Sequence, residues 1–268
     1  VAGTKNHAYF KKMTPPQLTE AEALELLAQH YGLTGQLFTL PGERDRNFQL
    51  CLASGEKNTF KVVNAEVPLE SLKTEIRAMQ HLNSELGSIV PHPLADQAGH
   101  FISQGNLQNG SACWLRLQSW QLGIPLAEFR PHTPELFHSV GHLMGQVVAS
   151  LSTLAVQDPH PELPWHPDQA LQIVEEGLSL VTDPLLKNFL EQALRLYDRY
   201  GRPLETDLPR SLIQNDANDY NILVHGGLEG LPKLSLIDFG DMVVSWTCAE
   251  AAVTLAYALL GQISPWKA

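Results

Sequence analysis

Cysteine is scarce in this sequence, and the few cysteines are far apart. Cys51, Cys113 and Cys248 are odd in number and form no C-x-x-C pair. This usage argues against a disulfide framework and against the common zinc motifs, and it is typical of a reducing compartment. The first twenty residues also lack the apolar core of a secretory signal. We therefore expect a cytoplasmic protein.

Long hydrophobic runs and an excess of positive charge are missing as well. No apolar run approaches the ~20 residues of a membrane-spanning helix, so we expect no membrane partner. Lysine and arginine number 18 against 29 acidic residues, for a formal net charge of −11. Because nucleic acids are bound by basic surfaces, this balance argues against a nucleic-acid partner. It is still compatible with a small anionic ligand, since one lysine and a divalent cation can reverse the local charge.

The first half of the chain predicts a small antiparallel sheet with one prominent helix. Thr19 and Glu22 form a capping-box pattern before a helix-periodic stretch that ends near Gly32. Strand-like segments follow at 36–40, 48–54, 59–65, 99–104 and 111–120, and an amphipathic helix is predicted at 68–86. We expect residues 1–118 to form one lobe that binds a nucleotide.

The second half of the chain is predominantly helical. Helical periodicity at 135–155, 169–181 and 184–200 precedes two short apolar strands and an alanine-rich segment, 249–261, which we expect to be a buried helix. Residues 119–268 are therefore expected to form a second, helical lobe. Because 249–261 would need further helices to cover its apolar faces, we expect this lobe to be truncated and the chain to be a fragment.

Polar side chains are concentrated beside the two short strands of the second half. The segment SLIQNDANDYNILV (211–224) carries Asp216 and Asn221 between apolar runs, and KLSLIDFGD (233–241) ends its apolar run with Asp238. A rigid scaffold can aim polar residues at strand ends. Carboxylate and amide oxygens suit Mg²⁺, and a separate aspartate can accept the proton of a hydroxyl. Phosphoryl transfer requires this division of roles.

These motifs carry a resemblance to a known family. D-x-x-x-x-N at 216–221, followed by I-D-F-G-D at 237–241, resembles the motifs of the protein-kinase-like superfamily. The segments are most similar to the aminoglycoside phosphotransferase and choline kinase branch, especially its hydroxylysine-kinase-like group, some relatives of which are fused to a class III aminotransferase. The resemblance implies an α+β bilobal fold with a small antiparallel-sheet N-lobe and a mostly helical C-lobe.

The resemblance also implies a role for individual residues. Asp216 would be the catalytic aspartate, and Asn221 and Asp238 would hold Mg²⁺. Lys61, in the strand-like segment TFKVV, would contact the α- and β-phosphates of ATP or GTP. Glu75, on the helix that follows, would pair with Lys61 and orient it.

A turn and a hinge would enclose the nucleotide. The turn LPGERDRNF (40–48) lies where the family covers the phosphates, although it lacks the G-x-G-x-x-G pattern of protein kinases. The connector at 118–121 is the expected hinge beside the purine. The residues implied to bind the nucleotide from these two segments are Gly42, Asn47, Ser119 and Gln121.

One residue departs from the family pattern. Gln214 occupies the position where the family usually has a histidine, two residues before the catalytic aspartate. Glutamine can donate and accept hydrogen bonds, so the loop geometry can survive the exchange. Asp241 matches a further acidic position, whose role the sequence does not define.

The predicted function is transfer of the γ-phosphate of ATP or GTP to a hydroxyl of a small amino alcohol, hydroxy amino acid or related compound. Two alternatives stay open at this point. One is a weakly active or inactive kinase-like module, in which Gln214 has cost the catalytic function and which is part of a larger protein with an aminotransferase domain. The other is an aminoglycoside-modifying enzyme.

Overall fold

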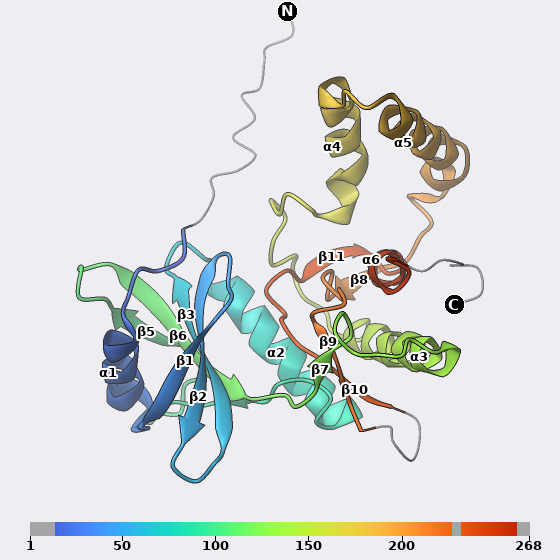
Figure 1. The fold of residues 1–268 in the computed structure, drawn as a ribbon. Coiled ribbons are helices and arrows are strands. Elements are labelled where there is room, and N and C mark those ends of the chain that lie inside the picture. The colour runs from blue at the N-terminus through green and yellow to red at the C-terminus, as the bar shows by residue number, and fades with distance from the viewer. Residues whose placement is uncertain (1–13, 227–231, 262–268) are drawn as a thin grey trace, which may run out of the picture.

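The computed structural model describes residues 14–226 and 232–261, and Figure 1 shows them as two lobes with helix α2 between them. The first lobe is a six-stranded sheet in which every described pairing is antiparallel, in the order β1-β2-β3-β6-β4, with β5 also pairing with β6. Its strands are β1 (Gly35–Leu40), β2 (Asp45–Leu52), β3 (Lys57–Asn64), β4 (Pro93–Leu94), β5 (Ser103–Asn106) and β6 (Ala112–Ser119).

Two helices accompany this sheet. In α1 (Glu20–Tyr31) the Thr19 hydroxyl accepts a hydrogen bond from the Glu22 backbone N–H, and Gly32 ends the helix with a left-handed φ of 65°. Thr19 therefore caps the helix and Gly32 ends it as the sequence predicted, but the reciprocal half of the capping box is not formed, because the Glu22 carboxylate accepts the Gln108 backbone N–H at 2.6 Å instead. Helix α1 packs on the outer side of the sheet, whereas α2 (Leu69–Leu86) contributes its apolar face to the core of the second lobe.

The second lobe combines helices with short strand pairs. Its strands are β7 (Ile124–Pro125), β8 (Arg210–Ile213), β9 (Ile222–His225), β10 (Lys233–Leu236) and β11 (Val243–Trp246). Its helices are α3 (Pro134–Leu151), α4 (Ala170–Gly177), α5 (Pro184–Leu196) and α6 (Ala249–Ala258), with short helical turns η1 (Pro167–Gln169), η2 (Leu178–Leu180), η3 (Tyr197–Gly201) and η4 (Arg202–Leu204). The core of this lobe forms where α2 and α3 pack with the strands β8 to β10. The predicted lobe boundary between residues 118 and 119 falls at the end of β6 and stays a prediction.

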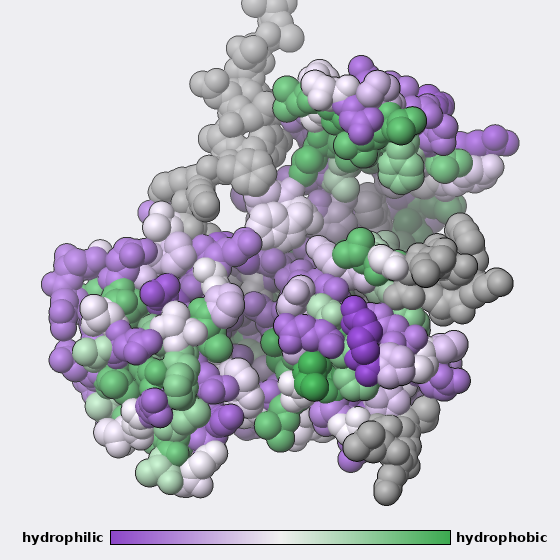
Figure 2. Space-filling view, viewed as in Figure 1, coloured by the Kyte–Doolittle hydropathy of each residue, from purple (hydrophilic) through white to green (hydrophobic). Residues whose placement is uncertain are grey.

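Two parts of the second lobe leave apolar surface exposed. Helices α4 and α5 project away from the body in Figure 1, and Figure 2 shows apolar side chains gathered over them. On α5, Leu185 is 82% and Phe189 66% exposed. The expectation that 249–261 is a buried helix is wrong, since Leu255 on α6 is 55% exposed. Helix α3 and strand β11 pack against α6 and leave the rest of its surface exposed. Because the segment 249–261 is apolar around most of the helix, its sequence does not indicate which side is covered.

Candidate active site

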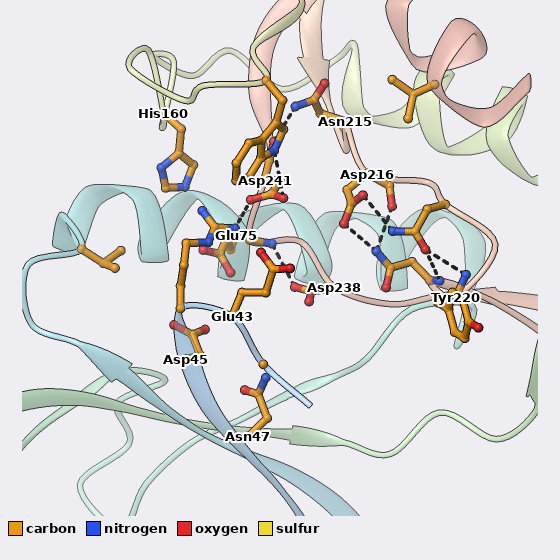
Figure 3. Close-up of a pocket in the computed structure, with 18 of the residues that line it drawn as sticks. Glu43, Asp45, Asn47, Glu75, His160, Asn215, Asp216, Tyr220, Asp238 and Asp241 are labelled. Carbon is orange, nitrogen blue, oxygen red and sulfur yellow. Dashed lines mark hydrogen bonds and ion pairs between the residues drawn. The ribbon is translucent and has the colours of Figure 1, made fainter. Parts of the chain in front are cut away.

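A cleft of about 950 Å³ lies between the two lobes. The turn after β1, strand β3 and helix α2 line it from one side, and the loops after β8 and β10 line it from the other (Figure 3). Seven of the nine predicted site residues line this cleft. They come from distant parts of the chain, since the first of them, Gly42, and the last, Asp238, are 196 positions apart. These seven are Gly42, Asn47, Lys61, Glu75, Asp216, Asn221 and Asp238.

The two predicted hinge side chains do not face this cleft. The Ser119 hydroxyl accepts a hydrogen bond from the His92 backbone N–H at 2.8 Å. The Gln121 amide donates to the Val90 carbonyl at 2.8 Å. Both side chains therefore hold the neighbouring segment 90–92, which the sequence did not indicate because this contact joins residues about thirty positions apart. A contact of the hinge backbone with a purine stays a prediction.

The pairing of β9 with β10 brings the predicted metal ligands together. Leu236 lies opposite Ile222, and the next residue, Ile237, donates its backbone N–H to the Asn221 carbonyl at 2.9 Å. Asn221 and Asp238 thus sit at adjacent ends of two paired strands. Asp238 has a left-handed φ of 56°, and its side chain is 47% exposed. Residues other than glycine, asparagine and aspartate rarely adopt this backbone conformation. In Asp238 it aims the carboxylate into the cleft.

Two asparagines hold the predicted catalytic carboxylate. Asp216 accepts hydrogen bonds from the amide of Asn218 at 2.8 Å and from that of Asn221 at 2.7 Å. Burial raises the pKa of Asp216 to about 6, aided by the charges of Asp241 and Asp238 and opposed by the two hydrogen bonds. The carboxylate is therefore more basic than an ordinary aspartate and still ionised at neutral pH.

Lys61 connects the first lobe to the loop that follows β10. Its side chain is buried on β3, and its Nζ lies 3.4 Å from an Asp238 oxygen and 3.7 Å from an Asp45 oxygen. The positive charge of Lys61 lowers the pKa of Asp238, so that this carboxylate stays ionised in the cleft. A lysine on a strand is usually a solvated edge residue, but Lys61 is a buried cation inside the site.

Glu75 does not pair with Lys61 as the resemblance implied. Its carboxylate instead accepts a 2.5 Å hydrogen bond from Arg116 on β6, and both side chains are almost completely buried. The sheet register explains this difference, because Arg116 lies directly opposite Lys61 in the β3–β6 pair and reaches the same face. The sequence offered one signal, a single arginine inside the apolar run ACWLRLQSW.

Gln214 links the two functional loops. Its side-chain carbonyl accepts the Asp216 backbone N–H at 2.8 Å, and its amide donates to the Asp238 backbone carbonyl. The side chain is fully buried. Because one glutamine both donates and accepts, the residue that departs from the family pattern still braces the loops, as the sequence analysis expected.

Glu250 is a part of this arrangement that the sequence analysis missed. It lies in the first turn of α6, and one carboxylate oxygen accepts the backbone N–H groups of Gln214 at 2.6 Å and Asn215 at 3.0 Å. Burial raises the pKa of Glu250 to about 7 against these two hydrogen bonds. The signal in the sequence was an isolated acidic residue at the start of an alanine-rich apolar segment.

Asp241 is engaged by two further residues that the sequence analysis did not select. Its carboxylate pairs with Arg44, in the turn between β1 and β2, and accepts a hydrogen bond from the indole N–H of Trp165 at 3.1 Å. The Arg44 guanidinium also lies over the Trp165 ring, 5.4 Å from its centre. A second ion pair therefore crosses the cleft beside that of Lys61 and Asp238.

Comparison with known proteins places the chain in a family. The profile described as "Phosphotransferase enzyme family" matches residues 40–264, which include the turn after β1, strand β3 and both loops of the cleft. This match covers most of the chain, and the chain belongs to the phosphotransferase enzyme family. Together with its relatives and its fold, this membership confirms the predicted class, a small-molecule kinase that phosphorylates a hydroxyl group.

Individual relatives agree with this assignment. Hydroxylysine kinase from Xenopus laevis is 24% identical over 278 residues, covering 94% of this chain and 73% of the relative. Hydroxylysine kinase from Mus musculus is 23% identical and covers 93% of this chain and 72% of the relative. The predicted similarity to the hydroxylysine-kinase-like group is thereby confirmed.

Solved structures support the fold. Amicoumacin kinase hAmiN, in complex with AMP-PNP, Ca²⁺ and Ami, superposes with a TM-score of 0.66 at 18% identity, covering 92% of this chain and 71% of that one. The microcompartment-associated aminopropanol kinase has a TM-score of 0.64 at 14% identity, covering 92% and 78%. These likenesses confirm the bilobal α+β kinase-like fold. Among the residues that the structure describes, no helix is long and apolar enough to cross a membrane.

Proposed function

We propose that this protein transfers the γ-phosphate of ATP or GTP to the hydroxyl of a small amino alcohol or hydroxy amino acid, with Mg²⁺ as the metal cofactor. The observation that carries the proposal is the convergence on one cleft of a buried lysine, a carboxylate–amide pair and a separate basic aspartate. Phosphoryl transfer needs these groups to hold the phosphates, the metal and the nucleophile together. The three cysteines are free, which supports a cytoplasmic location.

The nucleotide is proposed to lie between Lys61 and the turn that contains Gly42 and Asn47. Lys61 is a buried cation at the floor of the cleft, where its charge acts in a medium of reduced dielectric. Structural neighbours are named as complexes with AMP-PNP and with GDP, so both adenine and guanine nucleotides belong in the test.

Asp238 and Asn221 fit a magnesium ion. The carboxylate of Asp238 is half exposed in the cleft, and the Asn221 amide nitrogen donates to Asp216, which leaves the amide oxygen to face another partner. Mg²⁺ commonly takes one or two protein oxygens and completes its shell with phosphates and water. Within residues 14–226 and 232–261, no group of three His, Cys, Asp or Glu side chains could hold a metal alone, which agrees with such a shared site. When bound, the ion would neutralise phosphate charge.

Asp216 is proposed to orient the acceptor hydroxyl and to accept its proton. Its pKa of about 6 keeps it ionised at neutral pH while bringing its basicity closer to the working pH, which favours general-base catalysis. The two asparagine hydrogen bonds hold the carboxylate in one orientation.

The acceptor is proposed to carry a positive charge. The wall of the cleft contains three further carboxylates besides Asp216, Asp238 and Glu75, namely Glu43, Asp45 and Asp241. Lys61, Arg44 and Arg116 offset three of these six charges, and the negative charge that is left favours an ammonium group over a neutral or anionic substituent. The relatives named for hydroxylysine and aminopropanol suggest acceptors of this kind.

The proposal is tested by measuring ADP or GDP formation with 5-hydroxylysine, 1-amino-2-propanol, ethanolamine and kanamycin as acceptors. Asp216→Asn should lower kcat by about 10²- to 10⁴-fold, the usual contribution of a general base, while nucleotide affinity changes little. Asp219→Asn is the matched control. It makes the same change of charge only three residues along the chain, but the Asp219 side chain does not line the cleft. Nucleotide binding without turnover on any acceptor would instead identify a non-catalytic module.

A further inference from the structure

Arg44 extends from the first lobe into the cleft. It ends the turn 41–44, and its guanidinium pairs with Asp241 of the second lobe. A Cβ atom built on Gly240 would lie 3.8 Å from an Arg44 nitrogen and 3.4 Å from an Asp238 carboxylate oxygen. The guanidinium therefore lies against the same short stretch of backbone as the proposed metal ligand.

Positive charge is in short supply at this position. Of the described residues that line the cleft, Lys61 and Arg44 carry a fixed positive charge, and Lys61 is already shared between Asp45 and Asp238. Against them stand the five carboxylates of Glu43, Asp45, Asp216, Asp238 and Asp241, while the sixth carboxylate of the lining, that of Glu75, is paired with the buried Arg116. A nucleoside polyphosphate would add further negative charge, which a metal ion and these two cations must meet.

Asp241 has hydrogen-bond partners besides Arg44. Asp241 is held independently, because its carboxylate accepts from Trp165 and its backbone carbonyl accepts from the Asn215 amide, each at 3.1 Å. Burial alone would lower the pKa of Arg44. The charges of Asp241 and the other nearby carboxylates outweigh this effect and raise the pKa overall, so the side chain keeps its charge. The Arg44 side chain is 28% exposed and stands on an exposed turn.

We propose that Arg44 is a phosphate-binding residue that changes partners when the nucleotide enters. Before binding, its guanidinium rests on Asp241 and the Trp165 ring; after binding, it turns to the phosphates above Asp238. The planar fork of arginine matches two phosphate oxygens at once and carries a charge that cannot be lost at working pH. This inference rests on the proposed function, since it takes a nucleoside di- or triphosphate as the ligand.

The partner exchange predicts affinity changes of opposite sign. Calorimetric titration with ADP and with AMP-PNP, each with and without Mg²⁺, measures the dissociation constants. Arg44→Gln should weaken binding by about 10- to 100-fold, the loss expected for charge-assisted hydrogen bonds. Asp241→Asn should instead tighten binding of the metal-free nucleotide, because it removes the competing partner. The double variant should show no gain from Asp241→Asn once Arg44 is absent.

Two further variants separate a phosphate contact from a structural one. Arg77→Gln makes the same exchange at an exposed position on α2 that does not line the cleft, and it should not weaken binding. Arg44→Lys keeps the charge without the fork and should fall between wild type and Arg44→Gln. It also supplies the measurement if Arg44→Gln proves unstable in a denaturant titration. A merely structural pair would lower stability in both single variants and leave nucleotide affinity unchanged.

Each outcome decides a different point. If wild type binds nucleotide and Arg44→Gln binds it within twofold, Arg44 does not contact the phosphates, and the inference is wrong although the proposed function stands. If Arg44→Gln weakens binding but Asp241→Asn does not tighten it, Arg44 binds phosphate without an exchange of partners, which also overturns the inference as stated. If wild type binds no nucleotide at all, the inference and the proposed function fail together.

Discussion

At the scale of single residues, Gln214 shows how one side chain can replace another by keeping its hydrogen bonds. It fills the place of a histidine, yet it accepts from the Asp216 backbone and donates to the Asp238 backbone. The two loops that carry the proposed catalytic and metal-binding groups are thus fixed relative to each other. An amide suffices for this bracing because the position requires a donor and an acceptor, and not a proton transfer.

Removing this brace should damage both stability and turnover. Gln214→Ala leaves a buried N–H and a buried carbonyl unpaired, and each unpaired group costs about 1–3 kcal/mol. We expect the unfolding free energy to fall by that order and kcat to fall at least about tenfold, because misplacing a catalytic group lowers the rate steeply. Urea titration and steady-state kinetics measure the two effects.

Comparison variants make this prediction specific. Gln214→His should keep most of the activity, and Gln36→Ala, at an exposed strand position, should change neither quantity. Equal losses in Gln214→Ala and Gln36→Ala would contradict the bracing role.

Glu250 should make stability depend on pH near neutrality. Its pKa is raised from the ordinary 4.5 to about 7 in the folded protein, so the folded state holds a proton that the unfolded state releases. Stability from this group is therefore full below pH ~4.5 and is lost as pH rises towards ~7, by at most about 3 kcal/mol. Glu250→Gln keeps an oxygen that can accept both backbone N–H groups but cannot titrate. Its unfolding free energy, measured by urea titration from pH 5 to 8, should decline less than that of wild type; parallel curves would refute this prediction.

At the scale of the elements, the turn 41–44 depends on a glycine. A Cβ atom at Gly42 would lie 2.4 Å from the Asp45 carbonyl oxygen and 2.9 Å from the Asn47 amide. Gly42→Ala must therefore displace the turn, at a cost of about 1–3 kcal/mol for an overpacked site. We expect weaker nucleotide binding together with this loss of stability, both of which thermal denaturation with and without nucleotide can measure.

The matched control for this turn is Gly141→Ala. A Cβ atom there would meet no neighbour within 4 Å, apart from the helix's own backbone. Inside α3, alanine should stabilise the protein by about 0.5–1 kcal/mol. If Gly42→Ala behaved like Gly141→Ala, the turn would not be sterically constrained as described.

The contact between α2 and β6 predicts a large cost for breaking one buried ion pair. Glu75→Ala would leave Arg116 as an uncompensated buried charge, and the loss of one partner of such a pair typically costs about 3–5 kcal/mol. Replacing both residues, as in Glu75→Leu with Arg116→Met, should cost far less, because the charge that needs a partner is removed as well. Unfolding free energies of the two single variants and the double variant form a cycle that tests this coupling; additive losses would contradict it.

The sequence predicted the elements and the loops of the site for local reasons. Asp216, Asn221 and Asp238 were found because their spacing and their strand-end positions are written in short segments. The partner of Glu75 was not found, because Arg116 becomes its neighbour only through the β3–β6 register. The contacts of Asp241 with Arg44 and Trp165 were not found for the same reason, since they span up to 197 positions. Local signals identify residue types, and the pairing between distant elements decides which of them meet.

At the scale of the whole molecule, two ion pairs join the lobes across the cleft, Lys61 with Asp238 and Arg44 with Asp241. A ligand that binds between the lobes should therefore stabilise the entire fold. With Mg²⁺ and ADP at one hundred times the dissociation constant, the stabilisation should be about 2.7 kcal/mol. Omitting Mg²⁺ should reduce it, because the cleft is rich in carboxylates.

Thermal denaturation of wild type and of Lys61→Ala, each with and without ligand, measures this effect. We expect Lys61→Ala to lose most of the ligand-induced shift, whatever its stability without ligand. An unchanged shift in Lys61→Ala would place the nucleotide away from β3.

The brace formed by Gln214 also determines how the site can respond to acid. Imidazole, with an ordinary pKa near 6.5, gives up its acceptor nitrogen when it is protonated, so a histidine at this position would tie the shape of the two loops to the surrounding acidity. The glutamine amide has no proton to gain or lose over that range. Beneath the same loop, Glu250 does titrate near neutrality. Asp216 and Glu250 therefore respond to pH near neutrality, whereas the side chain that links the two loops does not.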